Sequence, residues 1–140
     1  MRYLAIDLGA RRTGLAVGDD ITGIASPLEV IATGSELERM RLIARAIDDH
    51  GPDTLVVGLP LNMDGTEGPA AKAMRLFGGQ LQQRFGLPVV YADERLSSVA
   101  ADEQMSQSGL THKGKKRRRD ALAAAAILRS FLATRGRDVT

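Results

Sequence analysis

The sequence predicts an α/β fold in which a mixed five-stranded sheet carries helices on both faces. Three observations lead to this class. Two mostly apolar, strand-like runs, Arg2–Leu8 and Thr13–Gly18, are separated by a short glycine-containing turn. A helix signal then begins at Ser35. Beyond it, apolar strand-like segments alternate with helical ones, which is typical of parallel strands reached through helices.

Local start and stop signals define the elements of the first half. A third short strand is expected at Leu28–Ile31, after Pro27. The first helix begins with the capping box Ser35–Glu38 and ends at Gly51.

The second half continues this alternation. We expect a strand at Thr54–Leu59, a polar loop at Leu61–Gly68, a helix from Pro69 to Gly86 and a buried strand at Pro88–Ala92. The second helix places on one face Ala70, Met74, Phe77 and Leu81. The remaining segments are expected to be a short helix at Ser98–Ser108, a loop at Gly109–Lys116 and a last helix at Arg119–Thr134.

This order predicts one domain covering residues 1–140, with an antiparallel meander of three strands followed by parallel strands. Ligands of such sheets collect at the carboxyl ends of the central strands. Asp7 lies near the end of the first strand and Glu94 lies just past the Pro88–Ala92 strand. Both are therefore expected at the same edge of the sheet.

Composition narrows the class of protein. The chain has 140 residues, is 44% hydrophobic and contains no cysteine, which excludes a disulfide framework and a cysteine-based zinc site. The two histidines, His50 and His112, match no metal-ligand spacing. No apolar run is long enough to span a membrane, and charged residues interrupt any signal peptide, so we expect a cytoplasmic protein with no membrane partner.

The net charge of +2 hides a local basic tract. Six of the 19 basic residues lie between Lys113 and Arg119, which leaves 13 basic residues against 17 acidic ones elsewhere. Such a cluster on an acidic body is typical of a docking surface for a polyanion, whereas the alternative is a solvated loop that aids solubility.

Asp7 is the most informative residue, because it stands alone inside an apolar strand. A carboxylate there is costly unless something pairs with it. One interpretation makes Asp7 a metal ligand, with Gly9 and Gly14 letting phosphate approach the backbone and Arg11, Arg12 and Thr13 touching that phosphate. The alternative is that Asp7 closes the turn through bonds to backbone N–H groups.

Asp93-Glu94-Arg95 follows an apolar strand and supplies the next acids. Adjacent side chains point in opposite directions, so one acid faces the site. Glu94 is favoured over Asp93, and Arg95 is expected either to hold a phosphate or to orient a carboxylate. A structural ion pair at a helix start is the alternative.

Asp120 begins the last helix, on the face that carries Ala124, Ile127 and Phe131. An acid in a first helical turn is favoured for electrostatic reasons alone. However, the basic tract immediately precedes Asp120, so a polyanion bound there would lie beside it. In the loop before the second helix, Asn62 is a candidate substrate contact, although Asp64-Gly65 is also ordinary turn chemistry.

These motifs together resemble the YqgF family of pre-16S rRNA nucleases, also described as Holliday junction resolvases. The resemblance spans the whole chain in order. The matching segments are Asp7–Gly9, Thr13–Val17, Ala25–Leu28, Val57–Gly65, Asp93–Ser98, Asp120–Ala124 and Ile127-Leu128. The Gly58–Gly65 and Asp93–Leu96 blocks are specific, whereas Asp7–Gly9 also occurs in sugar kinases and actin-like ATPases.

The resemblance implies a ribonuclease H-like fold and a metal-dependent nuclease that processes the 5′ end of pre-16S rRNA or cleaves branched DNA. It implies that Asp7, Glu94 and Asp120 are the catalytic acids, the same three that the residues themselves indicate. Junction cleavage needs two active sites, so that substrate would favour a homodimer.

Our hypothesis is phosphodiester hydrolysis assisted by Mg²⁺ or Mn²⁺, with Asp7 bridging the ions and Glu94 and Asp120 each holding one. The residues expected to contact the nucleic acid are Arg11, Arg12, Thr13, Asn62, Arg95, Lys115, Lys116, Arg117 and Arg118.

Two other classes compete with this hypothesis. A structured nucleic-acid-binding protein without catalysis would use the same basic tract, but it gains little from three acids facing a phosphate backbone. An actin-like phosphotransferase shares the Asp7–Gly9 block but needs a second lobe, which 140 residues do not supply.

Overall fold

A computed structural model describes residues 1–95 and 112–134, and for residues 112–119 only the backbone. One five-stranded sheet has the strand order β3-β2-β1-β4-β5. The elements are β1 (Arg2–Leu8), β2 (Arg12–Asp19), β3 (Ala25–Ala32), α1 (Glu36–His50), β4 (Thr54–Leu59), α2 (Pro69–Phe85), β5 (Val89–Asp93) and α4 (His112–Ala133).

The strand pairing confirms the predicted mixed sheet. β1 pairs antiparallel with β2, and β2 pairs antiparallel with β3, with a register shift at Leu15/Ala16. β1 and β4 are parallel, as are β4 and β5. The carboxyl ends of β1, β4 and β5 therefore meet at the same edge of the sheet.

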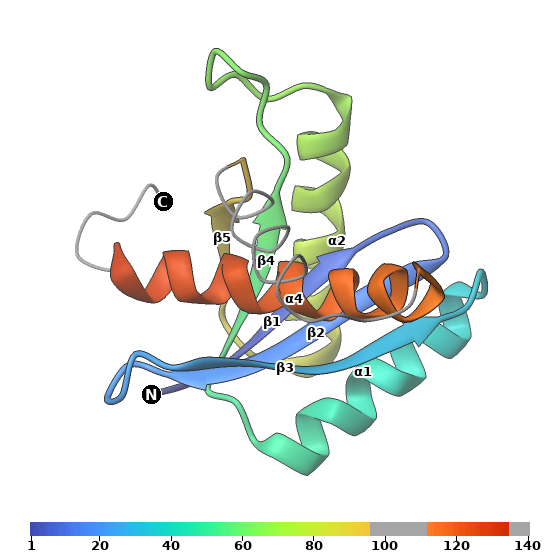
Figure 1. The fold of residues 1–140 in the computed structure, drawn as a ribbon, viewed down its shortest axis with the longest axis vertical. Helices are drawn as coiled ribbons and strands as arrows, with labels where there is room; N and C mark the ends of the chain where they lie inside the picture. The colour runs from blue at the N-terminus through green and yellow to red at the C-terminus, as the bar shows by residue number, and fades with distance from the viewer. Residues whose placement is uncertain (96–111, 135–140) are drawn as a thin grey trace.

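Helices cover both faces of the sheet (Figure 1), and each face has its own apolar core. α4 packs on one face, where Ala124, Ile127 and Phe131 are buried as their spacing predicts. α1 and α2 pack on the other face, where Ile43 and Leu81 are fully buried.

The alternation of side chains along β1 decides where Asp7 points. Leu4 and Ile6 belong to the core beneath α1 and α2, whereas Tyr3 and Ala5 belong to the core beneath α4. Because the period of a strand is two residues, Asp7 is on the α4 face. The one acid of β1 is thus directed at the helix that carries Asp120.

The ends of α1 follow the predicted signals. The Ser35 hydroxyl accepts a hydrogen bond from the Glu38 N–H at 3.2 Å. Gly51 ends the helix in the left-handed conformation, with φ of 55°, and donates its N–H to Ile47 O.

Several boundaries differ from the sequence prediction. β3 begins at Ala25 and includes Pro27, which an edge strand tolerates because one side of its ladder is open. In the first turn of α2 the buried alanine is Ala71, whereas Ala70, which was predicted on the apolar face, is exposed. The expected loop at Gly109–Lys116 is wrong in its last part, because α4 already begins at His112. The expected helix at Ser98–Ser108 is outside the described residues.

Within the parts of the chain that the structure describes, no helix combines the length and the apolar character that crossing a membrane requires.

Gly14 lets α4 lie directly against β2. A methyl group built on Gly14 would overlap the backbone carbonyl oxygen of Asp120. Real side chains cannot share that space, so any larger residue must push the helix away from the sheet. The absence of a side chain at Gly14 therefore sets the distance between α4 and the sheet, and with it the position of Asp120.

We predict that Gly14→Ala lowers the free energy of unfolding by roughly 1–3 kcal/mol, because overpacking separates α4 from β2. The matched control is Gly79→Ala in α2, where an added methyl meets nothing within 4 Å. The control should be neutral or stabilising, because glycine is a poor helix former. Urea unfolding of the three proteins measures both, and equal stability of Gly14→Ala and wild type would contradict the packing argument.

Candidate active site

Asp7 lies between two glycines on the neighbouring strands. Its cross-strand partner in β2 is Gly14. On the other side, Ile6 pairs with Val57 of β4, so Gly58 comes level with Asp7 one residue further along. The strand on each side of Asp7 therefore has no side chain at that level, which leaves room for groups from elsewhere.

The two gaps are filled by the segments that carry the other acids. The backbone of Asp120 lies against Gly14, as described above. The side chain of Glu94 lies over Gly58, where an added methyl carbon would be 2.6 Å from Glu94 Oε2 and 2.9 Å from Ile127 Cδ1. The structure thus brings together the three acids that the sequence predicts.

The pKa of Asp7 reflects its burial and the two neighbouring acids. Burial above all, together with the nearby charges of Glu94 and Asp120, raises the pKa of the Asp7 carboxyl from 3.8 to about 7. Burial also raises the pKa of Glu94, with a contribution from the Asp93 charge. A cation would relieve this repulsion, whereas a proton on Asp7 relieves it in its absence.

The donor set suits a hard divalent cation, which prefers carboxylate oxygens. Within residues 1–95 and 120–134, however, no three acidic or histidine side chains already converge as a finished ion cage. Glu94 and Asp120 are close enough to Asp7 to affect its pKa, but the three carboxylates do not form a ready metal site. The side chains of this carboxylate cluster would have to close around an ion.

Asp93 is excluded from this cluster by its partner. Its carboxylate accepts bonds from Arg95 Nη2 at 2.6 Å and from Arg95 Nε at 2.9 Å. These bonds, above all, hold the pKa of Asp93 below its usual value. Glu94, which the sequence favours over Asp93, is the residue whose side chain faces Gly58 and α4.

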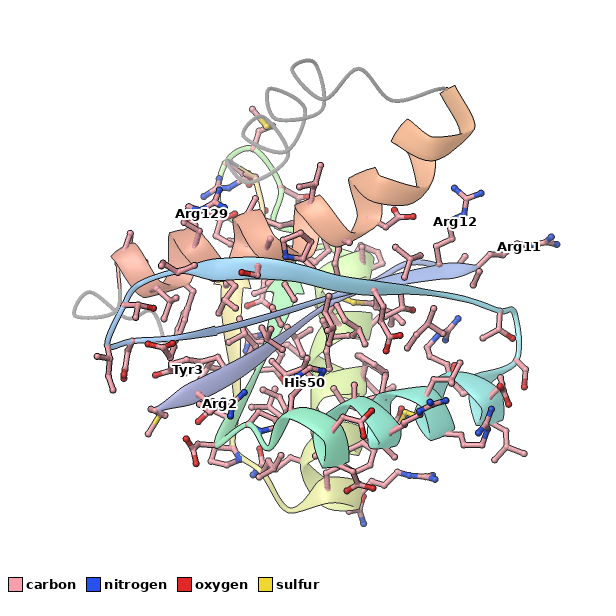
Figure 2. The ribbon with its side chains drawn as sticks, turned by 60° about the horizontal axis from the view of Figure 1, so that its bottom comes forward. Arg2, Tyr3, Arg11, Arg12, His50 and Arg129 are labelled. Atoms are coloured by element: carbon pink, nitrogen blue, oxygen red, sulfur yellow. The ribbon has the colours of Figure 1, made fainter. Side chains whose placement is uncertain are left out.

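Arg11 and Arg12 lie at the β1–β2 turn, close in sequence to Asp7. The turn is held by a 2.8 Å bond from Gly9 N–H to Arg12 O, and by a 2.9 Å bond from Thr33 N–H to Arg11 O. Figure 2 shows both arginine side chains projecting away from the body of the protein. The β1–β2 turn is on the side where α4 begins in Figure 1, and Figure 2 places both arginines on that same side.

Thr13 and Asn62 are placed differently from what the sequence suggests. Thr13 is 0% exposed and alternates with Gly14 along β2, so its side chain is directed away from α4, into the opposite core. It does not reach the surface beside Asp7. Asn62 is exposed in the β4–α2 loop, but its amide donates to Thr66 Oγ1 at 2.9 Å and so closes the loop.

The basic residues before Asp120 are helical. The backbone of residues 113–119 belongs to the first turns of α4. The same helix that carries Asp120 therefore carries the backbone of Lys115, Lys116, Arg117 and Arg118, although their side chains are outside the described part.

The roles of Gly58 and Gly14 differ from what the sequence suggested. Gly14 was expected to let phosphate approach the backbone, but in β2 it makes room for the backbone of Asp120. No role was predicted for Gly58 by itself. Gly58 lies inside the fully buried strand β4. Glycine within an apolar strand marks a close approach of another group, and this signal was available in the sequence.

The fold defines the class, which is ribonuclease H-like. The fold matches Thermus thermophilus RuvC in complex with a Holliday junction substrate, with a TM-score of 0.54 and 22% identity over 97% of this chain and 96% of that one. It also matches the Fowlpox virus resolvase in complex with Holliday junction DNA, with a TM-score of 0.58 and 13% identity over 96% of this chain and 98% of the other.

The chain belongs to the RuvX family, whose model is described as a Holliday junction resolvase and matches residues 1–134. A relative from Geobacillus kaustophilus, named "Putative pre-16S rRNA nuclease", is 44% identical over 94% of this chain and 97% of its own. A relative of the same name from Neisseria gonorrhoeae is 43% identical over 92% of this chain and 85% of its own. The family resemblance found in the sequence is confirmed.

The raised pKa of Asp7 predicts a pH-dependent stability in the presence of a chelator. Between pH 3.8 and about 7 the folded chain holds a proton that the unfolded chain has lost. Folding is therefore favoured below this range, and its stability falls as the pH rises through it. The total loss is up to about 4 kcal/mol, at roughly 1.4 kcal/mol per pH unit.

Asp7→Asn should remove this loss. We expect the variant to be the more stable protein at about pH 8, with an advantage over wild type that shrinks toward about pH 4. Denaturant unfolding in EDTA across this range measures the difference. A difference between the two proteins that does not change with pH would show that Asp7 titrates normally.

Proposed function

We propose that this protein is a metal-dependent nuclease whose active site consists of Asp7, Glu94 and Asp120. The observation that carries the proposal is the burial of Asp7 beside Glu94 and Asp120, because burial and these two charges together raise the pKa of Asp7 to about 7. Carboxyl groups with a strongly perturbed pKa are typical of functional sites, because the chemistry there requires a particular protonation state. Membership of a nuclease family supports the same reaction class.

Each acid has a role that follows from its element. Asp7, fixed by β1 at the centre of the cluster, is the ligand that an ion would share with both neighbours. Glu94, on the segment after β5, and Asp120, on α4, approach from opposite sides. Mg²⁺ or Mn²⁺ bound there would activate the attacking water and neutralise the leaving oxygen.

The positively charged groups would hold the substrate backbone. Arg11 and Arg12 project beyond the β1–β2 turn (Figure 2), and the basic tract belongs to the first turns of α4. Contacts of this kind position phosphates and do not read bases. Thr13 is left out of this set because it is buried.

The substrate that we propose is the 5′ region of precursor 16S rRNA, in the cytoplasm, since relatives at 43–44% identity carry that name. The second candidate is a four-way DNA junction, which the family description and the resolvase fold favour. A junction needs two cuts, so on DNA the protein would act as a homodimer.

A cleavage assay with Asp7→Asn tests the site and the substrate together. Wild type with Mg²⁺ or Mn²⁺ should cut either a precursor rRNA fragment or a four-way DNA junction in preference to linear controls. Asp7→Asn should lose cleavage by a factor of 10² or more, on the order of other losses of electrostatic stabilisation. Its affinity for the uncut substrate should be largely retained.

The substrate that wild type cuts assigns the biological role. Normal cleavage by Asp7→Asn would contradict the assignment of the site. Binding without cutting by wild type on every substrate and with both ions would favour a non-catalytic binding protein.

The double variant Arg11→Ala/Arg12→Ala tests whether these two arginines contact the backbone of the substrate. We expect weaker binding to all sequences and a salt dependence that is less steep by up to about 2 in slope on duplex DNA, because two phosphate contacts are lost. The matched control is Arg41→Ala/Arg45→Ala, which removes two exposed charges from α1 on the opposite face. Equal slopes for both double variants would place the substrate elsewhere.

A further inference from the structure

The loop between β4 and α2 is an ordered element beside the carboxylate cluster. This 61–68 loop (Leu61–Gly68) rises beyond the sheet in Figure 1. It is closed by bonds from Asn62 N–H to Thr66 O at 2.9 Å and from Gly65 N–H to Asn62 O at 2.8 Å. Asp64 accepts both the N–H and the hydroxyl of Thr66. These bonds give the loop a single shape but do not fix it to the sheet.

Arg95 provides the attachment to the sheet. Its Nη1 donates to the carbonyl oxygens of Asn62 and Met63, each at 3.1 Å. Its Nε and Nη2 bind the Asp93 carboxylate side-on, with distances of 2.9 and 2.6 Å. A guanidinium has five N–H donors, and these bonds use four of them in a planar fork.

We propose that Arg95 is a positioning residue that fixes the 61–68 loop against the end of β5, and thereby holds Glu94 and the loop in one arrangement. Asp93 and Arg95 flank Glu94, and Glu94 N–H itself donates to Leu59 O at 3.3 Å, just before the loop. Glu94 is thus part of a segment that is hydrogen-bonded both to the last residue of β4 and to the 61–68 loop. The acid and the loop cannot shift independently while the Arg95 bonds persist.

The sequence left two roles open for Arg95, namely holding a phosphate or orienting a carboxylate, and the pair with Asp93 corresponds to the second. A guanidinium that binds phosphate bidentately must present two free N–H groups on one edge. Here the Nε–Nη2 edge faces Asp93 and the Nη1 group faces two carbonyls. Binding a phosphate would require breaking these bonds, so the geometry favours the loop attachment.

The catalytic consequence rests on the proposed nuclease function, but the attachment itself does not. Loss of Arg95 should let the loop move and let Glu94 drift from its place over Gly58. A displacement of about 1 Å at a reacting centre lowers a rate by up to about 100-fold. The substrate contacts at Arg11, Arg12 and α4 are elsewhere, so binding should change little.

The test compares Arg95→Met and Arg95→Lys with wild type by backbone ¹⁵N relaxation. We expect order parameters of about 0.85 for Asn62–Thr66 in wild type and below about 0.6 in both variants, because methionine has no N–H donor and the ammonium group of lysine lacks the planar fork.

The matched control is Arg41→Met, which removes a side-on pair with Glu38 on α1, with bonds of 3.0 and 2.6 Å. This control variant should leave the 61–68 loop as rigid as in wild type. An equally rigid loop in Arg95→Met overturns the proposal, whatever the enzyme cleaves.

Kinetics on the substrate that wild type cuts separates positioning from binding. Positioning predicts that kcat falls about 10- to 100-fold with KM and the salt slope of binding unchanged, and that Arg95→Lys does not restore kcat. A shallower salt slope in Arg95→Met that Arg95→Lys restores would identify a phosphate contact and overturn the proposal. If wild type cuts nothing, the proposed function is lost, and the relaxation data alone decide the role of Arg95.

Discussion

The site depends on the burial of the Asp7 carboxylate between two glycines of the neighbouring strands. Asp7 lies on the α4 face of β1, and the neighbouring strands have Gly14 and Gly58 at its level. An ionised group in such a place is costly unless charge or hydrogen bonds compensate it. The space beside Asp7 is instead occupied by the segments that carry Glu94 and Asp120, which raises the cost further. A divalent cation held by the three acids, as we propose, would offset this cost.

The rest of the fold keeps this arrangement in place. α4 can approach β2 only because Gly14 has no side chain, so packing of its alanine-rich face also sets the position of Asp120. On the opposite side, the Asp93–Arg95 pair joins the end of β5 to the 61–68 loop and keeps Glu94 between them. The stability of the fold and the proposed chemistry therefore depend on the same contacts. Substitutions of Gly14 or Arg95 should lower activity because they displace Asp120 or Glu94, although both carboxylates are still present.

Much of this could be predicted from the sequence, because its signals are local. A lone acid in an apolar strand identified Asp7, and the alternation of strands and helices predicted the sheet and the edge at which Glu94 lies. What could not be predicted depends on contacts between distant segments. The core position of Thr13 follows from which face of β2 meets the core beneath α1 and α2, and the backbone of the basic tract belongs to α4, although its sequence was expected to form a loop up to Lys116. The bonds of Arg95 to loop carbonyls likewise exist only in the folded chain.

Calorimetric titration with Mn²⁺ tests most directly whether the three acids form one metal centre. Performed at about pH 6 in buffers of different ionisation enthalpy, it counts the protons released on binding. Since the pKa of Asp7 is about 7, Asp7 is mostly protonated at that pH without a cation. We expect binding by wild type with release of about one proton per site, and loss of both the release and most of the affinity in Asp7→Asn. Equal affinity and equal proton release in the two proteins would contradict a metal centre at Asp7.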